Sequence, residues 1–137
     1  MPAHILVLDD DQDIALMLKD RLNFLGYYAT TANNGVEGLA MLETMAIDGI
    51  LLDVQMPIMD GLTMLKYLQD QHPQVPVIMM TAEFNKNSLM QAMQRGARDY
   101  LLKPIDSECF TQKCSTVFIP RKAKVNKDDY ASIQRIT

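Results

Sequence analysis

The sequence predicts a single α/β domain in which a parallel sheet carries helices on both faces. Three observations support this fold class. The chain has 137 residues, 48% of them hydrophobic, which is enough to bury one core without disulfides or a structural metal. Short continuous apolar runs alternate with segments of helical periodicity, and glycine or asparagine interrupts the chain between several of them. Such alternation favours right-handed strand–helix–strand crossovers, which build a parallel sheet.

The predicted strands are apolar runs that do not alternate with polar residues, as expected where both faces of a strand are covered. They span residues 5–8, 50–52, 75–80 and 100–102, and residues 27–31 form a fifth strand. Gly26 follows the first predicted helix, Asn34-Gly35 opens the second, and Gly96 follows the fourth as a left-handed cap. Strand and helix therefore alternate throughout.

Helices are predicted where apolar residues recur at a spacing of three or four. The inward positions are Ile14, Leu18, Leu22 and Leu25, then Val36, Leu39 and Ala40, then Leu62, Leu65 and Leu68, then Leu89, Ala92 and Met93, and last Cys109, Phe110, Val117 and Phe118. Asp106 is placed to cap the last helix, and Pro120 to stop it.

The end of the chain differs from the rest in composition. From Arg121 onward it is polar and locally basic, and Tyr130, Ile133 and Ile136 could form a short amphipathic turn. We interpret residues 1–119 as one domain and residues 120–137 as a C-terminal extension or the start of a linker.

Composition excludes several classes of function. A formal net charge of −4 gives no large basic field, so we expect no direct binding of nucleic acid and instead expect cations or protein partners. The chain does not start with a targeting segment, and no apolar run approaches the ~20 residues that cross a bilayer. We expect a soluble, cytoplasmic protein with no membrane contact.

Cysteine and histidine give no sign of a disulfide or a metal site. Cys109 and Cys114 lie five apart in one predicted helix, too far around and along it to bridge each other. We interpret both as small helix or core residues. His4 and His72 are far from each other in sequence, and surface or strand-edge positions are expected for both.

Polar residues collect where the predicted strands end, the edge at which open parallel sheets place their functional groups. Asp9, Asp10 and Asp11 follow the first strand, and Asp53 ends the third. Two further polar residues, Thr81 and Lys103, follow the fourth and fifth strands. Each alone could be a turn or cap residue. Together they have the chemistry of a site for a divalent cation and a phosphoryl group.

Magnesium is the cation that such a set of carboxylates favours. Several carboxylates on one edge need a cation or raised pKa values, and Mg²⁺ typically takes one or two protein carboxylates together with phosphate oxygens. Asp10 and Asp53 could supply the carboxylates. Lys103 and the Thr81 hydroxyl could then hold the remaining phosphoryl oxygens and stabilise the charge that develops during phosphoryl transfer.

Four motifs resemble those of a known family. The segments ILVLDDDQDI, ILLDVQMPIMDGL, VIMMTAEF and GARDYLLKPID are similar, in order and spacing, to the receiver-domain motifs of two-component response regulators. The resemblance covers about residues 4–118. It implies a CheY-like, flavodoxin-like doubly wound fold with five parallel strands in the order 2-1-3-4-5.

The resemblance also implies roles for individual residues. Asp53 matches the phosphoacceptor, Asp9 and Asp10 match the acidic Mg²⁺ pair, and Gln55 would give the metal a backbone carbonyl. Thr81 and Lys103 would contact the phosphoryl group, Tyr100 matches the switch aromatic, and Lys103-Pro104 matches a cis peptide. Such a protein is a phosphoacceptor signalling domain and not an enzyme acting on other substrates.

The implied partners are a sensor histidine kinase or a histidine phosphotransfer protein, and a downstream protein or output domain. The segment from Ser107 to Phe118 lacks the Leu- and Arg-rich pattern that is usual in the last helix and that serves the family's common dimer contacts. Whether the chain forms a phosphorylation-dependent homodimer is therefore left open. Gln55 and Glu83 occupy positions that vary in the family and influence the phosphoryl lifetime. The chain is either a stand-alone receiver or part of a longer regulator.

Three other functions share parts of this pattern. A haloacid-dehalogenase-like phosphatase would use Asp9 and Asp11 as its catalytic pair, but no Gly-Thr follows them. A flavodoxin would need a phosphate-cradling loop where this chain has three aspartates. A pseudo-receiver that works without phosphorylation is compatible only with a diverged output surface, because the residue set for phosphorylation is complete.

Overall fold

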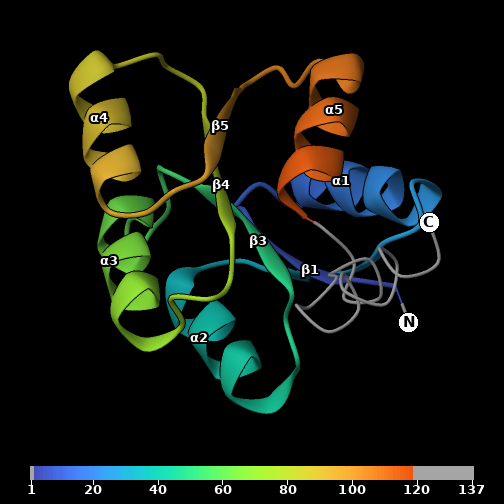
Figure 1. Ribbon diagram of the computed structural model, residues 1–137, viewed down its shortest axis with the longest axis horizontal. Helices are drawn as coiled ribbons and strands as arrows, with labels where there is room; N and C mark the ends of the chain where they lie inside the picture. The colour runs from blue at the N-terminus through green and yellow to red at the C-terminus, as the bar shows by residue number, and fades with distance from the viewer. Residues whose placement is uncertain (1, 119–137) are drawn as a thin grey trace, which may run out of the picture.

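The computed structural model describes residues 2–118 and contains a five-stranded parallel sheet in the order β2-β1-β3-β4-β5 (Figure 1). The strands are β1 His4–Leu8, β2 Tyr28–Ala32, β3 Gly49–Asp53, β4 Val77–Thr81 and β5 Asp99–Leu102. The helices are α1 Gln12–Phe24, α2 Gly35–Thr44, α3 Gly61–Gln71, α4 Lys86–Gln94 and α5 Ser107–Val117. The predicted α/β fold class and strand order are confirmed.

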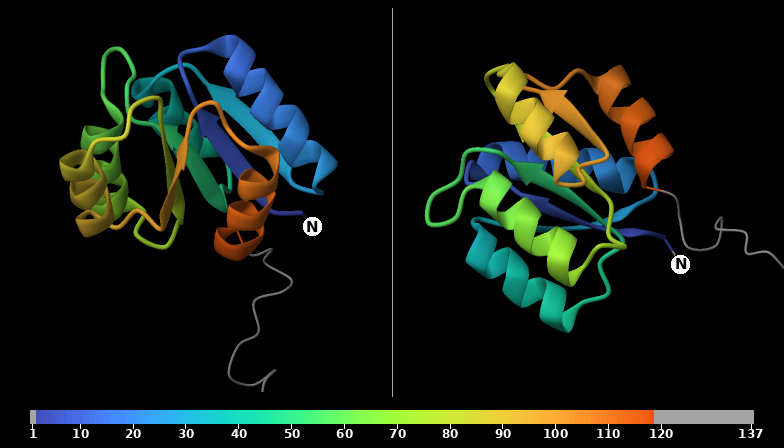
Figure 2. Two further views of the ribbon diagram at one scale, coloured as in Figure 1. Left: turned by 90° about the horizontal axis from the view of Figure 1, so that it is seen from above. Right: turned by 60° about the vertical axis from the view of Figure 1, so that its left-hand side comes forward.

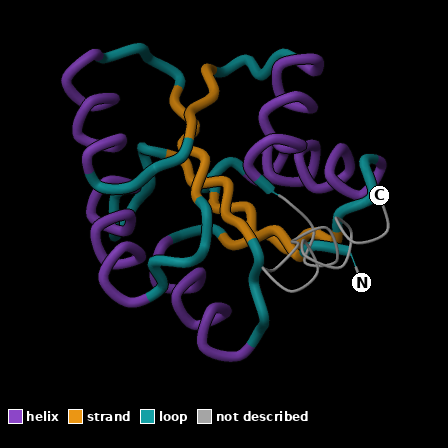
Figure 3. Tube along the Cα trace, viewed as in Figure 1, coloured by secondary structure: helices purple, strands orange, loops and turns teal. Residues whose placement is uncertain are grey.

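The molecule has three layers, with the sheet in the middle (Figures 2 and 3). Helices α1 and α5 cover one face, and α2, α3 and α4 cover the other (Figure 1). Two separate apolar clusters fill the spaces between these layers. Every residue of β3 is buried, as expected for the central strand of a sheet covered on both sides.

Two predicted strands are displaced along the chain. β4 begins at Val77, two residues later than predicted, because Pro76 has no N–H to give to the ladder. β2 begins at Tyr28 because the Tyr27 N–H donates to the carbonyl of Leu22, in the turn that ends α1 (2.9 Å). β4 also extends to Thr81, which the sequence placed just after the strand.

Short polar side chains cap the helices as their sequence positions suggest. Asp11, Asn34, Asp60, Asn85 and Asp106 each accept a hydrogen bond from a backbone N–H in the first turn of a helix. Such caps satisfy donors that the helix itself leaves free. They also hold the loops that precede the helices, and these loops lie at the carboxyl ends of the strands.

The predicted inward faces of α2 and α4 are partly wrong. Val36, Ala40 and Met93 are exposed. In α2 the buried positions are instead Gly35, Gly38 and Leu42. The glycines let this helix lie directly on side chains beneath it, so apolar periodicity alone pointed to the wrong stripe.

The cysteines are free, as expected: Cys109 is half-buried and Cys114 is buried. Burial raises the pKa of the Cys114 thiol to about 12, which keeps it protonated and unreactive. None of the helices within residues 2–118 is long and apolar enough to span a membrane. The predicted extension, residues 120–137 with Tyr130, Ile133 and Ile136, lies outside the described residues.

Candidate functional site

The parallel strands bring the predicted polar residues to one edge of the sheet. Asp9 directly follows β1 and Asp53 ends β3, and these two strands are paired neighbours. Thr81 ends β4, and Lys103 follows β5 at the next position after the Thr81–Leu102 pair. These four residues therefore lie at the same edge of the sheet, beside the point where the strand order reverses between β1 and β3.

Three carboxylates form the centre of this site. One oxygen from each of Asp9, Asp10 and Asp53 lies within 4.8 Å of the other two. Asp9 is fully buried, Asp53 is 4% exposed and Asp10 is exposed. Within residues 2–118 this is the one cluster of acidic, histidine or cysteine side chains with the spacing of a metal site.

Lys103 joins the two buried carboxylates. Its Nζ lies 2.8 Å from Asp9 Oδ2 and 3.2 Å from Asp53 Oδ2. The Lys103 backbone N–H donates to the carbonyl of Thr81 (2.8 Å), and the bond to Pro104 is cis, as the family resemblance implied. The ammonium thus compensates part of the negative charge that the sheet edge concentrates.

The ionised form of Asp53 remains disfavoured despite this ammonium. Burial, followed by the charge of Asp9, raises the pKa of Asp53 to about 6, although Lys103 and the Gln55 N–H both oppose the rise. Burial lowers the pKa of Lys103, but its hydrogen bond to Asp9 and the charges of Asp53 and Asp9 outweigh this, so its pKa is raised. One positive charge does not fully offset the carboxylates, and a cation would relieve the excess.

The loops that carry the carboxylates are held by local hydrogen bonds. Asp9 Oδ1 accepts from the Asp11 N–H (2.9 Å), and Asp11 Oδ1 accepts from the N–H groups of Asp13 and Ile14 at the start of α1. Asp53 Oδ1 accepts from the Gln55 N–H (3.3 Å). Asp11 therefore serves as a helix cap, which leaves Asp10 as the exposed carboxylate of the cluster.

Thr81 belongs to the site's edge, but its hydroxyl is engaged within its own loop. The Thr81 hydroxyl donates to the Glu83 carbonyl (2.9 Å) and accepts from the Glu83 N–H (3.3 Å). Tyr100, on β5, is half-buried and lines a cavity of about 30 Å³ together with Thr81 and Leu89. This volume is about one water molecule, so the tyrosine ring cannot move further inward unless Thr81 or its neighbours move.

Sequence reasoning missed two residues that the structure ties to the site. A Cβ on Gly61 would lie 2.3 Å from the backbone oxygen of Asp53, so only glycine fits there. Lys113 of α5 contacts both Asp99 and Tyr100. The sequence signal for Gly61 was its place in the MDGL motif; a lone lysine in a predicted helix gave no signal for Lys113.

Comparisons with known proteins agree with this geometry. Residues 5–115 match the family model of the response regulator receiver domain. The chain belongs to this family. Receivers are phosphoacceptor signalling modules of two-component systems, so the family resemblance drawn from the motifs is confirmed, and a haloacid dehalogenase or a flavodoxin is excluded.

The curated relatives are longer proteins than this chain. The chain is 44% identical over 102 residues to the DNA-binding transcriptional regulator NtrC of Salmonella typhimurium, which is 74% of this chain and 22% of NtrC. It is 32% identical to the response regulator MprA of Mycobacterium ulcerans over 100% of this chain and 58% of MprA. The chain thus spans only about a fifth of NtrC.

Solved receivers share the fold closely. Chemotaxis protein CheY4 of Vibrio cholerae superimposes with a TM-score of 0.80 at 30% identity, covering 85% of this chain and 99% of CheY4. The Francisella response regulator 1452 receiver domain gives a TM-score of 0.79 at 31% identity, covering 85% and 96%.

The donor set of this receiver fits Mg²⁺. All three clustered side chains offer carboxylate oxygens, the ligands that Mg²⁺ prefers. The exposure of Asp10 leaves one side of the cluster open to water, which Mg²⁺ usually retains as part of its coordination shell. The raised pKa of Asp53 indicates that this edge favours additional positive charge.

Proposed function

We propose that Asp53 accepts a phosphoryl group and that Asp9, Asp10, Asp53 and the backbone carbonyl of Gln55 hold Mg²⁺ beside it. The observation that supports this most strongly is the carboxylate cluster of Asp9, Asp10 and Asp53, bridged by Lys103 at 2.8 and 3.2 Å. A bound Mg²⁺ would neutralise charge on the transferring phosphoryl oxygens.

The transfer is a displacement at phosphorus. An ionised Asp53 carboxylate oxygen attacks, a new P–O bond forms, and the P–N bond of a phosphohistidine or the P–O bond of an acyl phosphate breaks. The leaving group departs with the bonding electron pair. Lys103 Nζ, already between Asp9 and Asp53, then binds a phosphoryl oxygen, and the Thr81 hydroxyl binds another after leaving Glu83.

The acyl phosphate on Asp53 acts by shifting a conformational equilibrium. When Thr81 moves toward the phosphoryl group, the small cavity beside it enlarges and accepts the Tyr100 ring. The surface formed by α4, β5 and α5 changes as a result. Phosphate therefore biases two existing arrangements of the same domain.

The phosphoryl donor is a histidine kinase, the partner that receiver domains imply. The kinase transfers the group directly or through a histidine phosphotransfer protein. A small phosphodonor can take its place. The signal passes to a downstream protein or an output domain. The NtrC relatives are DNA-binding transcriptional regulators, which supports transcription as the controlled process. Residues 1–119 would be the receiver, and residues 120–137 an extension or linker.

The first experiment is intact mass after incubation with acetyl phosphate, with and without Mg²⁺, on the wild type and on Asp53→Asn. We expect a phosphoryl adduct that requires Mg²⁺ and is lost in Asp53→Asn. Asp70→Asn, an exposed carboxylate on α3, is the matched control and should react as the wild type does. An adduct that persists in Asp53→Asn would overturn the assignment.

A further inference from the structure

The ammonium group of Lys113, in the middle of α5, contacts the edge strand β5. Its Nζ lies 3.0 Å from Asp99 Oδ1 and 2.5 Å from the Tyr100 carbonyl oxygen, and 4.5 Å from the centre of the Tyr100 ring. An ammonium group has three donor hydrogens. Two have acceptors on β5, and the cation also lies over the ring face of Tyr100.

These contacts are only partly open to solvent. The Lys113 side chain is 24% exposed and that of Asp99 is 33% exposed, so water screens them only in part. A cation near an aromatic face is attracted by the ring quadrupole, and the two hydrogen bonds hold Nζ there. The Asp99 carboxylate also accepts a hydrogen bond from the Tyr100 N–H (2.8 Å), so the two residues that Lys113 contacts are bonded to each other.

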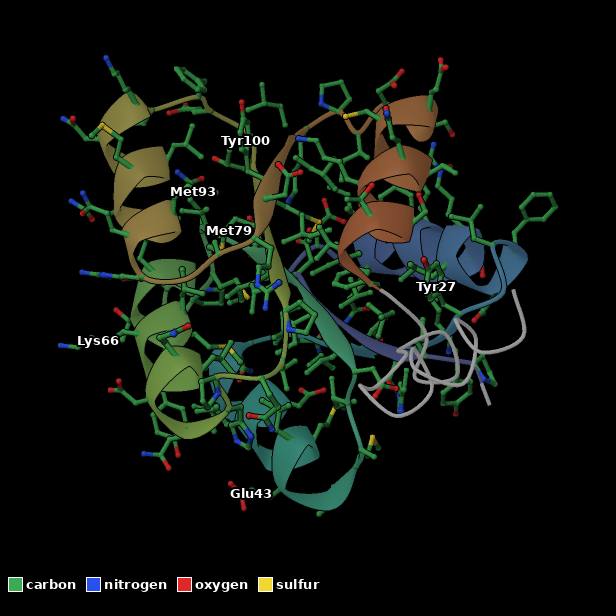
Figure 4. The ribbon with its side chains drawn as sticks, in the orientation of Figure 1. Tyr27, Glu43, Lys66, Met79, Met93 and Tyr100 are labelled. Atoms are coloured by element: carbon green, nitrogen blue, oxygen red, sulfur yellow. The ribbon has the colours of Figure 1, made fainter. Side chains whose placement is uncertain are left out.

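Tyr100 has two kinds of neighbour. It lines the cavity of about 30 Å³ that it shares with Thr81. Lys113 from α5, which does not line this cavity, has its ammonium over the ring. Figure 4 shows Tyr100 near the end of β5, in the region between α4 and α5. Deeper entry of the ring would separate it from the ammonium, because Nζ is tied to the backbone of the strand.

We propose that Lys113 is a positioning residue for the phosphorylation of Asp53. It holds the Tyr100 ring in the arrangement described above and thereby opposes the move to the phosphorylated conformation. This inference rests on the proposed function, since it takes Tyr100 as the switch aromatic. Lys113 acts only through Tyr100 and touches none of the reacting atoms.

The test compares rates of phosphorylation by acetyl phosphate with Mg²⁺ present. Lys113→Met keeps the aliphatic stem and removes the charge, and we expect it to react about two- to fivefold faster, the factor that a partly exposed cation–π contact contributes to a two-state equilibrium. Lys113→Arg should return the rate to the wild-type value. Lys66→Met makes the same charge change on the exposed face of α3 and should leave the rate unchanged.

A double mutant separates a direct role from a general loss of structure. In a Tyr100→Leu background there is no ring for the lysine to hold, so Lys113→Met should add no further change in rate. The NMR signals of the Tyr100 ring should move, in unphosphorylated Lys113→Met, toward their positions in the phosphorylated wild type. An unchanged or slower Lys113→Met, or an effect that persists without the ring, would overturn the proposal.

Failure of the two proposals would look different. If the wild type gives no adduct on Asp53, the proposed function fails. The ring signals of Tyr100 in the unphosphorylated protein would still show whether Lys113 holds it, with a beryllofluoride-treated sample as the reference for the active arrangement. If the adduct forms normally and Lys113→Met changes neither the rate nor the ring signals, only the role of Lys113 fails.

Discussion

The protonation of the Asp53 carboxylate depends strongly on its surroundings. Burial and the neighbouring Asp9 raise its pKa to about 6, whereas phosphoryl transfer requires the ionised form. Lys103 supplies part of the compensation through its 3.2 Å contact with Asp53. The site is therefore most strained when it contains neither a metal nor a proton, and that strain favours the binding of a cation.

The first prediction concerns the stability of the metal-free protein. The pKa of Asp53 is about 6 in the folded protein, against an ordinary value of 3.8 for an aspartate in an unfolded chain. Between these two values the folded protein binds more protons than the unfolded chain does. The free energy of unfolding should therefore fall as pH rises through this window. We expect a fall of about 2–3 kcal/mol, since one pKa unit corresponds to about 1.4 kcal/mol and the shift spans about two units.

Urea denaturation in EDTA at pH 4 to 7.5 measures this effect. Asp53→Asn removes the titrating group and should make the profile flatter and the protein more stable at neutral pH. Asp70→Asn, an exposed acid on α3, should keep the wild-type slope. A stability that rises from pH 4 to 6 in wild type but not in Asp53→Asn would contradict the raised pKa.

The second prediction concerns Asp10. Its side chain is exposed and lies within 4.8 Å of the other two carboxylates, so Asp10→Asn should leave the fold intact but remove a metal ligand. We expect the affinity for Mg²⁺ to fall about tenfold or more, which is about 1.4 kcal/mol. Titration calorimetry gives the affinity directly, and the rise in melting temperature with Mg²⁺ gives an independent value. Equal affinity in wild type and Asp10→Asn would remove Asp10 from the site.

At the scale of the elements, the loop from β3 to α3 is packed closely against the site. Gly61 N–H donates to the Val54 carbonyl (2.8 Å), and its Cα faces the backbone of Asp53. Asp60 caps α3 by accepting from the Thr63 N–H (2.8 Å). The helix start thus presses against the end of the strand that presents the phosphoacceptor, with no space for a side chain between them.

The third prediction contrasts two glycines. In Gly61→Ala the new Cβ would lie 2.3 Å from the Asp53 backbone oxygen, and in Gly38→Ala it would lie 2.6 Å from the Leu8 side chain. Backbone cannot turn aside, so Gly61→Ala should cost about 2–3 kcal/mol and slow phosphorylation. In Gly38→Ala the side chain can shift, and the gain of about 1 kcal/mol in helix propensity offsets part of the strain.

Urea midpoints and acetyl phosphate rates distinguish the two variants. Gly38→Ala should stay within about 1 kcal/mol of the wild type and keep its phosphorylation rate, because Gly38 packs on Leu8 and not on the acidic cluster. If Gly61→Ala proved as stable and as reactive as Gly38→Ala, the close approach to Asp53 would have no functional weight.

What the sequence could predict at this scale depended on local signals. Asp9, Asp53 and Lys103 were identifiable because each ends an apolar run, and parallel pairing then places them at one edge. The buried face of α2 could not be identified in this way. Gly35 and Gly38 lie on that face, and a glycine gives no apolar signal in the sequence.

Contacts between distant segments had no signal at all. Lys113 reaches Asp99 across 14 positions of sequence, and the match depends on how α5 lies against β5. The sequence also could not predict the hydrogen bonds of the Thr81 hydroxyl, because a hydroxyl at a strand end can bond either to its own loop or to the groups of the site. Local rules name the candidates, and tertiary packing decides what each one touches.

At the scale of the whole molecule, the sheet has an apolar cluster on each face, and the end of α5 contributes Phe118 to one of them. Phe118 is 1% exposed, and a Cβ on Gly49 would lie 2.4 Å from its ring. The Tyr27 hydroxyl donates to the carbonyls of Cys114 (3.1 Å) and Phe118 (3.3 Å). The core that α1 and α5 form on their face of the sheet therefore needs residues up to 118.

The fourth prediction tests the proposal that the domain ends at residue 119. A chain of residues 1–119 keeps both apolar clusters, so its free energy of unfolding should match that of the full chain within about 0.5 kcal/mol. A chain that ends at Lys113 loses Cys114 and Phe118 and should lose at least about 3–5 kcal/mol, as deletion of a buried phenylalanine does. The full-length Phe118→Ala variant separates loss of the ring from loss of the last helical turn.

Urea midpoints of the four proteins measure these differences in stability. A large loss in the 1–119 chain would make residues 120–137 part of the folding unit, and a stable chain ending at Lys113 would show that the face under α1 closes without Phe118.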